Sequence, residues 1–293
     1  MYFIGSALVI GLGFLILLVM GLNLGVDFDS GTSLEVLIEN QPFTIAEVKD
    51  IVSGTGYIPG DVTLAGNQNE FAMILFKDML NPDQIKEIST ALKQKYGENN
   101  VAISESTVSP MVARELARDA FIAILIASVG IIIYVAFRFE FRYGIASIIA
   151  LFHDAFFVIA IFSLLRIEVD LTFIAAILTI VGYSINDTIV IFDRIRENMK
   201  FSKVKTIEDL SAVVNRSIVE TLARSINTSL TVVFAAVALF FLGGEGIRNF
   251  SFALMIGLLV GAYSSIFIAA QVWLVLKGRE LKKKMYNPQA ESS

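Results

Sequence analysis

The hydrophobic positions of this chain fall into six long runs, separated by one polar segment near the N-terminus and by charged links. Each run holds about 20 residues, the length that an α-helix needs to cross the hydrocarbon core of a bilayer. The pattern therefore predicts six transmembrane helices, at residues 2–22, 120–137, 143–165, 171–192, 225–244 and 249–276. The first run lacks the basic start and small-residue cleavage site of a signal peptide, so we expect it to persist as a span.

The polar segment after the first run predicts one soluble domain. Thr44 with Glu47 three residues later is a capping-box signature, and Asn81 followed by Pro82 marks the start of a second helix. Period-two alternation predicts strands at 32–38, 62–65, 70–76 and 101–108, with a turn at Gly66 and Asn67. The resulting βαββαβ order is typical of a ferredoxin-like α+β domain. It shows no catalytic constellation, so we expect binding or mechanical work there and no enzyme activity.

These elements divide the chain into a membrane part and one inserted domain. We expect a first transmembrane helix at 1–23, the soluble domain at 24–112, helices 2–6 at 113–277 and a basic cytoplasmic tail at 278–293. Within the third part, a charged cytoplasmic loop with an amphipathic helix is predicted at 193–224. The predicted fold class is an α-helical polytopic membrane protein whose ferredoxin-like domain lies between helices 1 and 2.

Composition supports this class and excludes others. Of the 293 residues, 55% are hydrophobic and only 17% are charged, with a mean hydropathy of +0.70. The absence of cysteine and the single histidine exclude disulfides and thiolate sites and leave little for any metal site. A net charge of -5 without a basic, aromatic-rich patch gives no sign of nucleic-acid binding.

The distribution of Lys and Arg predicts the orientation of the spans. Cytoplasmic links carry an excess of these residues. They gather in the link after the second run, in 193–224 and in the tail after the sixth run, whereas the short links on the opposite side hold only Arg166 and Arg248. We therefore expect a multi-pass membrane protein with both termini in the cytoplasm and the soluble domain outside.

Asp187 is a single carboxylate inside the fourth run. Such a group costs about 2.5–3.5 kcal/mol at the centre of a bilayer, which makes it a candidate functional residue. Helical periodicity predicts a polar stripe around it, formed by Thr172, Thr179, Tyr183, Asn186 and Asp193. A proton-carrying site is one interpretation. A helix-packing device is the other, because Asn, Thr and Asp also hold membrane helices together.

Two further polar groups interrupt the apolar runs. His153 and Asp154 lie midway through the third run, where they either carry protons or form a hydrogen-bonded pair that fixes helix packing. Arg224 opens the fifth run and is followed by a second polar stripe that includes Asn227 and Thr228. Asp187 lies about 7 Å below the cytoplasmic end of its helix, a distance that an arginine can bridge. Arg224 is thus a candidate partner of Asp187 or an ordinary positively charged residue of a cytoplasmic link.

Three motifs resemble those of a known family. They are GYSINDTIVIFDRIREN at 182–198, TLARSINTSLT at 221–231 and VDFDSGT at 26–32. With one span, an external domain and five further spans, the chain is similar to half of a transporter of the resistance–nodulation–division superfamily. The motifs resemble those of the SecF family of the bacterial Sec export machinery, as a separate subunit or as the SecF half of a fused SecDF.

The resemblance implies a function and partners. SecD and SecF assist polypeptide export at the SecYEG channel, drawing on the proton-motive force. The implied partners are therefore SecD, separate or fused, SecYEG, the unfolded polypeptide in transit and the surrounding lipid, with the proton gradient as energy source and no other cofactor. Asp187 and Arg224 take proton-pathway roles together with an Asp on SecD.

Two departures from the family pattern stand out. The family commonly has Gly-Gly in the first motif, where this chain has Ser30 and Gly31; we expect Gly31 to keep the turn. Relatives carry an acid at the start of span 6, where this chain has Asn249, which cannot ionise.

Two rival functions remain open. One is half of a small-molecule proton antiporter of the same superfamily, which needs a larger external substrate pocket than one domain of this size offers. The other is a structural subunit that conducts nothing. It predicts that neutralising Asp187 leaves export intact.

Overall fold

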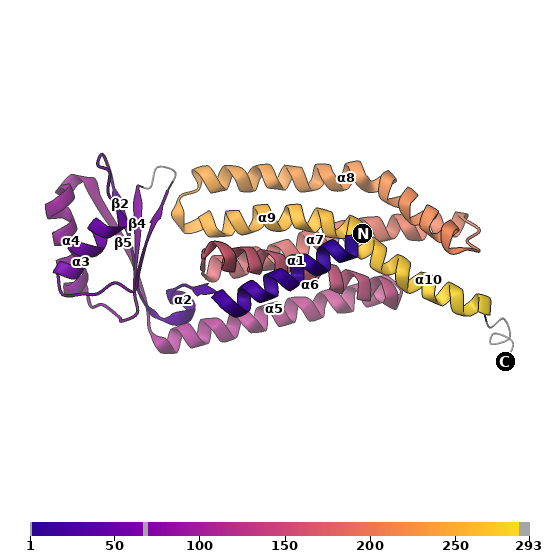
Figure 1. Cartoon of the computed structure of the whole chain (residues 1–293), viewed down its shortest axis with the longest axis horizontal. Coiled ribbons are helices and arrows are strands. Elements are labelled where there is room, and N and C mark those ends of the chain that lie inside the picture. The colour runs from indigo at the N-terminus through magenta and orange to yellow at the C-terminus, as the bar shows by residue number, and fades with distance from the viewer. Residues whose placement is uncertain (1, 67–69, 287–293) are drawn as a thin grey trace.

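The structure, a computed structural model of the chain, describes residues 2–66 and 70–286. A small α/β domain lies at one end of an elongated molecule, and long helices form a bundle that makes up the rest (Figure 1). Asn67 of the predicted turn and residues 287–293 of the predicted tail lie outside the described residues.

The bundle is built from long apolar helices. Its elements are α1 (Tyr2–Met20), α5 (Pro110–Arg138), α6 (Phe141–Leu165), α7 (Leu171–Phe201), α8 (Ile207–Leu242), α9 (Arg248–Ser264), the π-helical turn η3 (Ser265–Ala269) and α10 (Ala270–Tyr286). Within the described residues, five helical stretches are long and apolar enough to cross a membrane, and they correspond to predicted spans 2–6. The apolar stretch Leu8–Met20 of α1 is shorter than these five, so the sixth span stays a prediction.

The segment 193–224 differs from its prediction as a charged loop. α7 continues to Phe201 and α8 begins at Ile207, so both helices extend beyond the apolar runs. A capping box formed by Thr206 and Asp209 starts α8, and the predicted amphipathic helix and the fifth span are one continuous helix of 36 residues. The apolar runs mark only the lipid-compatible part of each helix, whereas capping residues set its ends.

The α/β domain has the predicted order of elements. It runs β2 (Gly31–Ile38), α3 (Ile45–Gly54), β3 (Asp61–Ala65), β4 (Phe71–Phe76), α4 (Pro82–Tyr96), η1 (Glu98–Asn100) and β5 (Val101–Val108). The sheet order is β3-β4-β2-β5, with every neighbouring pair antiparallel. Both predicted helix starts are confirmed, since Thr44 and Asn81 each form a capping box.

The two faces of this sheet have different neighbours. Alternate side chains of β2 and β4, such as Leu34, Val36 and Ile74, are buried against α3 and α4. These two helices lie on the side of the sheet away from the bundle (Figure 1). The opposite face, which includes Ser33 and Glu35, is turned towards the bundle and lines a cavity there.

Short elements join the domain to the bundle. β1 (Asn23–Leu24) follows α1 and pairs in parallel with β6 (Glu168–Val169), which links α6 to α7. Arg166 donates from Nη1 to the Met20 carbonyl oxygen at 2.7 Å, and the Ser163 hydroxyl donates to the Gly21 carbonyl at 2.6 Å. α1 is thereby fastened to the end of α6 that lies nearest the domain.

The turn between α2 (Val26–Asp29) and β2 holds the two residues of the first motif. Gly31 has φ 122°, and a Cβ there would collide with the carbonyl oxygen of Phe76, so only glycine fits. Ser30 has φ 61° and ψ 167°, a conformation that glycine adopts far more readily. The departure from Gly-Gly therefore places backbone strain, about 1–3 kcal/mol, on Ser30.

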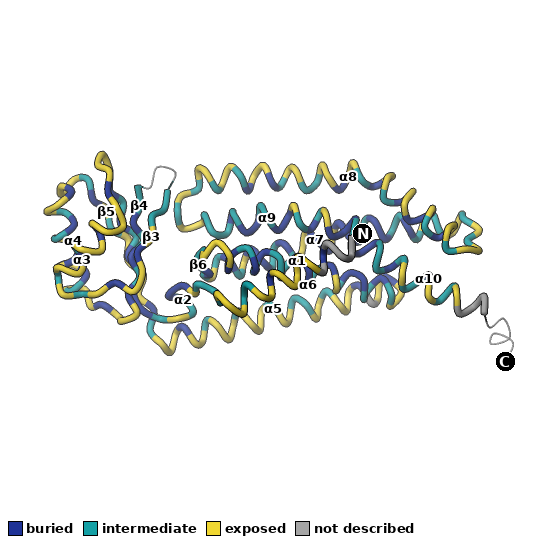
Figure 2. The backbone as a smooth tube through the Cα atoms, viewed as in Figure 1, coloured by how far each residue is buried: buried dark blue, intermediate teal, exposed yellow. Residues whose placement is uncertain are grey.

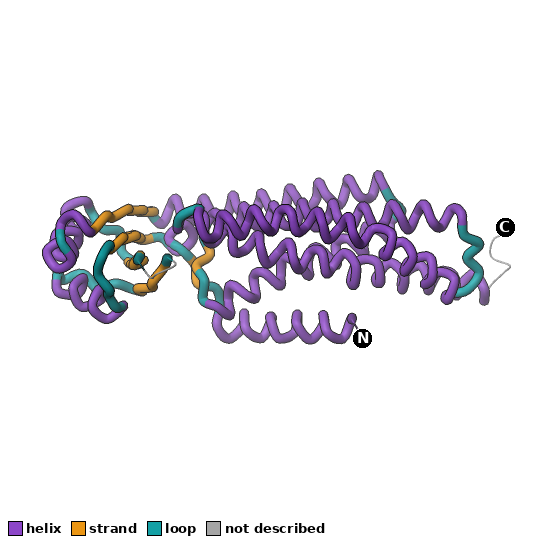
Figure 3. The backbone as a smooth tube through the Cα atoms, turned by 90° about the horizontal axis from the view of Figure 1, so that it is seen from above, coloured by secondary structure: helices purple, strands orange, loops and turns teal. Residues whose placement is uncertain are grey.

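Burial within the bundle is uneven. α1, α5 and the outer side of α8 are mostly exposed along their length (Figure 2), whereas α6 and α7 hold ten and eleven buried residues and α9 holds seven. Seen from above, the N-terminal helix lies at one side of the bundle (Figure 3). α9 packs closely against α7 because Gly257 brings its backbone onto Ile180, which leaves no room for a Cβ.

Candidate functional site

The predicted polar stripe on α7 does not act as one surface. Asp187 is buried, with 6% of its surface exposed, whereas Tyr183 and Asn186 are exposed. Thr179 donates its hydroxyl to the Ala175 carbonyl at 2.7 Å, within its own helix. Asp193 lies in the charged end of the helix and pairs with Arg138 at 3.1 Å and Arg196 at 2.8 Å. Asp187 is therefore more deeply buried than Tyr183 and Asn186, although Tyr183 lines the same small cavity as the Asp187 carboxylate.

The Asp187 carboxylate borders a small cavity between α7, α8 and α9. The cavity has a volume of about 10 Å³, and its lining includes Ser184, Thr228, Ser229 and Gly261. Such a volume holds at most about one water molecule. Asp187 Oδ2 is buried and has no hydrogen-bond partner among the described residues. A buried carboxylate oxygen without a donor is costly, so this atom marks a place where a proton or a donor group is missing.

Arg224 lies near this carboxylate on α8 but does not form an ion pair with it. Its charge acts on Asp187 electrostatically, and the hydroxyls of Ser225 and Ser229 on the same helix are within hydrogen-bonding reach of the carboxylate. Arg224 itself is exposed, as is Asn227 three residues later. The predicted Asp187–Arg224 pair is thus close in space without a direct ion pair, and the Arg224 guanidinium is on the exposed side of the site.

Asp154 occupies the opposite kind of environment. It is fully buried, and Oδ2 accepts hydrogen bonds from the hydroxyls of Ser184 on α7 at 2.5 Å and Ser264 on α9 at 2.7 Å. Oδ1 lies 3.1 Å from Nδ1 of His153. The predicted His153–Asp154 contact is present, and two serines that the sequence reasoning missed complete it. Three helices, α6, α7 and α9, meet at this one carboxylate.

Small residues on α9 make this meeting possible. Gly261 brings the α9 backbone beside Ser184 and Asp154; a Cβ at this position would lie 3.3 Å from Ser184 Cβ and 3.7 Å from Asp154 Oδ2. With Gly257 it forms the motif GLLVG, a small-xxx-small spacing that allows close helix packing in membranes. Ser265, at the start of the π-helical turn, shares a hydrogen bond of 2.9 Å with Thr188. The GLLVG spacing is the signal that could have revealed this side of the site.

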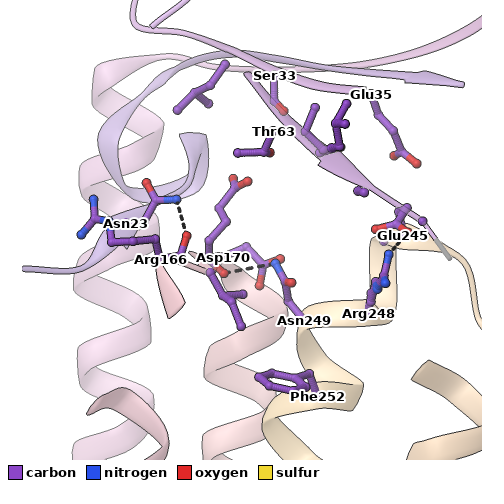
Figure 4. Close-up of a pocket in the computed structure, with 18 of the residues that line it drawn as sticks. Asn23, Ser33, Glu35, Thr63, Arg166, Asp170, Glu245, Arg248, Asn249 and Phe252 are labelled. Atoms are coloured by element: carbon purple, nitrogen blue, oxygen red, sulfur yellow. Dashed lines mark hydrogen bonds and ion pairs between the residues drawn. The ribbon is translucent and has the colours of Figure 1, made fainter. Parts of the chain in front are cut away.

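A second group of carboxylates lies outside the bundle. A cavity of about 550 Å³ separates the open face of the sheet from the links between the helices (Figure 4). Its acidic lining residues come from both sides: Glu35, Asp61, Glu168, Asp170 and Glu245. Arg248 pairs with Glu245 at 2.6 Å, and the Arg166 guanidinium is bonded to the Met20 carbonyl. Acids thus outnumber bases around this outer cavity.

Glu168 is the most perturbed of these acids. Burial above all, together with the charges of the neighbouring Asp170, Asp27 and Asp61, raises its pKa to about 7. Burial and Glu245 likewise raise the pKa of Glu35. Asn249 donates from Nδ2 to the Glu168 main-chain oxygen at 3.1 Å, so a titratable carboxyl stands beside Asn249. Within the described residues, no cluster of three or more His, Asp and Glu side chains is arranged to hold a metal ion.

Comparison with known proteins identifies related chains. The model of the C-terminal domain of the protein export membrane proteins SecD and SecF matches residues 87–279, and the SecD/SecF GG motif matches residues 15–41. The protein translocase subunit SecDF of Bacillus subtilis is 52% identical over 96% of this chain and 38% of its own length. The protein translocase subunit SecF of Alicyclobacillus acidocaldarius is 48% identical over 96% of this chain and 92% of its own.

A solved structure agrees with these sequence matches. The crystal structure of SecDF from Thermus thermophilus, described as a translocon-associated membrane protein, superposes with a TM-score of 0.83 at 36% identity. The match covers 94% of this chain and 37% of that chain. The chain therefore spans little more than a third of the SecDF proteins and nearly all of the Alicyclobacillus SecF.

Proposed function

Because the chain belongs to the SecD/SecF family of protein export membrane proteins, we propose that it is an accessory subunit of the Sec translocase that uses the proton-motive force. With SecD, separate or fused, it promotes the export of unfolded polypeptide through SecYEG. Asp187 carries this proposal: it is a buried carboxylate with one oxygen free of hydrogen bonds, beside an arginine on the next helix. A group in this position gains and loses a proton at low cost when its surroundings shift.

The arrangement supports a coupling between protonation and helix movement. With Arg224 close, the ionised form of Asp187 is favoured; with Arg224 withdrawn, the low dielectric of the bundle favours the protonated form. Proton uptake and release thereby accompany the retreat and approach of α8 relative to α7. The links that end these helices line the outer cavity under the soluble domain, so their movement reaches that domain.

The exposed polar side chains support a protein partner in the membrane. Asn186 on α7 and Arg224 and Asn227 on α8 have no covering element among the described residues of this chain. Polar and charged groups at such positions are costly against lipid, so a second membrane protein covers them. We assign this surface to SecD, whose own acid is the partner that the proton pathway requires.

Topology and domain type complete the proposal. All six apolar runs span the membrane, with the soluble domain, ferredoxin-like in its βαββαβ order, on the outer side. The basic residues support this orientation, since Arg138, Arg142 and Lys277 lie at the end of the bundle opposite the sheet. Arg138 pairs there with Asp193, and Arg142 and Lys277 both pair with Glu280. Both termini are then cytoplasmic.

The test is gradient-driven export by membrane vesicles that contain the variants Asp187→Asn and Arg224→Ala. Each abolishes the gradient-dependent part of export while expression and association with SecD persist. The double variant loses no more than either single one, because removal of one member already destroys the switch. Asp193→Asn, on the same helix but in the surface charge cluster, is the matched control and keeps export. If each variant loses only part of the export activity and the two losses multiply in the double variant, Asp187 and Arg224 do not act as one unit. Full export by Asp187→Asn would favour the alternative that the chain is a structural subunit that conducts no protons.

A further inference from the structure

Asp154 raises a problem of charge that its hydrogen bonds alone do not solve. It lies at the centre of the bundle with none of its surface exposed. No Lys or Arg of the described chain pairs with it, and His153 is the only group in contact that can become a cation. α1, which packs on α6, has no titratable side chain in residues 3–20. An anion buried without compensation costs several kcal/mol, so the His153–Asp154 pair is stable when it holds one proton.

The same pair is also well equipped to lose that proton. Ser184 and Ser264 donate to Oδ2, and a neutral His153 protonated on Nδ1 donates to Oδ1. Three donors stabilise an ionised carboxylate. Ser264 has a second acceptor in the Gly261 carbonyl at 3.1 Å, so it is able to release Oδ2 when that oxygen takes a proton. The surrounding hydrogen-bonding groups can therefore stabilise the His153–Asp154 pair both with and without the proton.

Ser184 connects this pair to Asp187. It lies one helical turn before Asp187 on α7, donates to Asp154 and lines the cavity that Asp187 borders. The absence of a side chain at Gly261 keeps the space beside the serine open. The Ser184 hydroxyl thus contacts the Asp154 carboxylate and lines the space of about 10 Å³ that Asp187 borders, which has room for about one water.

We propose that the His153–Asp154 pair is a second proton-holding site of the bundle and that the Ser184 hydroxyl carries protons between this pair and Asp187. The proposal rests on the proposed function of Asp187 and deepens it. In one direction, Asp154 Oδ2 releases its proton to Ser184 Oγ, and the serine releases its own hydroxyl proton to a water in the cavity. The water passes a proton to Asp187. Serine and water regain their composition, the pair has lost one proton and Asp187 has gained one.

The consequence is that one negative charge moves between two prepared positions. It resides on Asp187 when Arg224 is near and on Asp154, among its three donors, when Arg224 has withdrawn. The groups that face Asp154 are His153 from α6, Ser184 from α7 and Ser264 from α9. The bundle then never holds two uncompensated anions, and its internal charge is the same before and after the transfer.

The test is difference infrared spectroscopy of the full chain with its SecD partner in vesicles while the pH is stepped. The carbonyl stretch of a protonated carboxyl reports each site directly. We expect two such signals, one lost in Asp154→Asn and the other in Asp187→Asn. In Ser184→Ala both carbonyl signals remain, but a loss of the Asp154 signal is no longer accompanied by a gain of the Asp187 signal. Gradient-driven export is lost in this variant. Ser184→Cys, which keeps a weak donor, gives an intermediate result.

Ser251→Ala is the matched control. Ser251 is a buried serine of α9 that donates only within its own helix, to the Ile247 carbonyl at 2.7 Å, and its loss leaves export unchanged. The proposal is overturned if no carboxyl signal disappears in Asp154→Asn, or if Ser184→Ala exports as well as Ser251→Ala. If Asp187→Asn abolishes gradient-driven export while Asp154→Asn and Ser184→Ala retain it, only the relay fails. Retention by Asp187→Asn removes the proposed function itself.

Discussion

The carboxylates inside the bundle and those around the outer cavity belong to one chain but obey different rules. Inside, Asp154 Oδ2 accepts hydrogen bonds from two serines, whereas Asp187 Oδ2 has no hydrogen-bond partner among the described residues. Outside, five acids and two arginines line one space of about 550 Å³. Burial makes the inner acids individually decisive, whereas the outer acids act through their sum.

This difference separates two kinds of proton response. An inner acid responds to the position of a neighbouring helix, because the dielectric around it is low and its partners are few. An outer acid responds to the pH of the surrounding water, because water and neighbouring carboxylates set its affinity for protons.

The largest expected effect comes from truncating Asp154. Asp154→Ala leaves the donors of Ser184, Ser264 and His153 without an acceptor in a dry site, so we expect a loss of about 3–5 kcal/mol in the free energy of unfolding. Asp61→Ala, in the exposed lining of the outer cavity, changes it by less than about 0.5 kcal/mol. Denaturant or thermal unfolding in detergent measures both. Equal losses of unfolding free energy in the two variants would contradict the claim that single acids matter more inside the bundle than around the outer cavity.

A middle-sized effect is expected for Glu168. Its folded pKa of about 7 exceeds the ordinary value of 4.5, so the folded state binds the proton more tightly. Stability therefore falls as the pH rises from about 4.5 to about 7 and stays low above that. Glu168→Gln removes this fall and raises stability at pH 8 by about 1–3 kcal/mol, but not at pH 4. Unfolding midpoints across this range provide the measurement, and an unchanged pH profile would contradict it.

The smallest effect should follow from replacing a neighbour of Glu168. Asp61 raises the pKa of Glu168 by charge repulsion, as the last of three such neighbours in strength. Asp61→Asn thus moves the midpoint of the pH-dependent fall slightly to lower pH and slightly reduces its amplitude, because the amplitude depends on the difference between the folded and unfolded pKa of Glu168. Titration of Glu168 by infrared difference spectroscopy follows the shift. An unchanged midpoint would mean that the charge of Asp61 does not act on Glu168.

Much of this architecture could be predicted from the sequence because it depends on local signals. The apolar runs, the capping residues Thr44 and Asn81 and the alternation in the strands each encode their own element. The helix ends were harder, since α7 and α8 extend past the apolar runs into segments rich in charge. The joining pair β1 and β6 is too short and too distant along the chain for any local pattern to reveal it.

The ionisable residues of the candidate site could be predicted from the sequence, but their hydrogen-bond partners could not. A carboxylate in an apolar run is conspicuous, so Asp154 and Asp187 could be found. Ser184 and Ser264 are ordinary residues of membrane helices, and only the close approach that Gly261 permits gives them a role. Helical periodicity also grouped Asp187 with Asn186, although Asp187 is buried and Asn186 is exposed.

The uninterrupted length of α8 has a mechanical consequence. The helix is about 54 Å long at 1.5 Å per residue, and Arg224 is close to its midpoint. If the helix pivots at its first residues, where Thr206 and Asp209 form the capping box, the far end travels about twice as far as Arg224. The far end leads directly into Glu245 and Arg248 at the outer cavity. α8 is thus a lever that enlarges a small displacement beside one carboxylate into a larger one beneath the soluble domain.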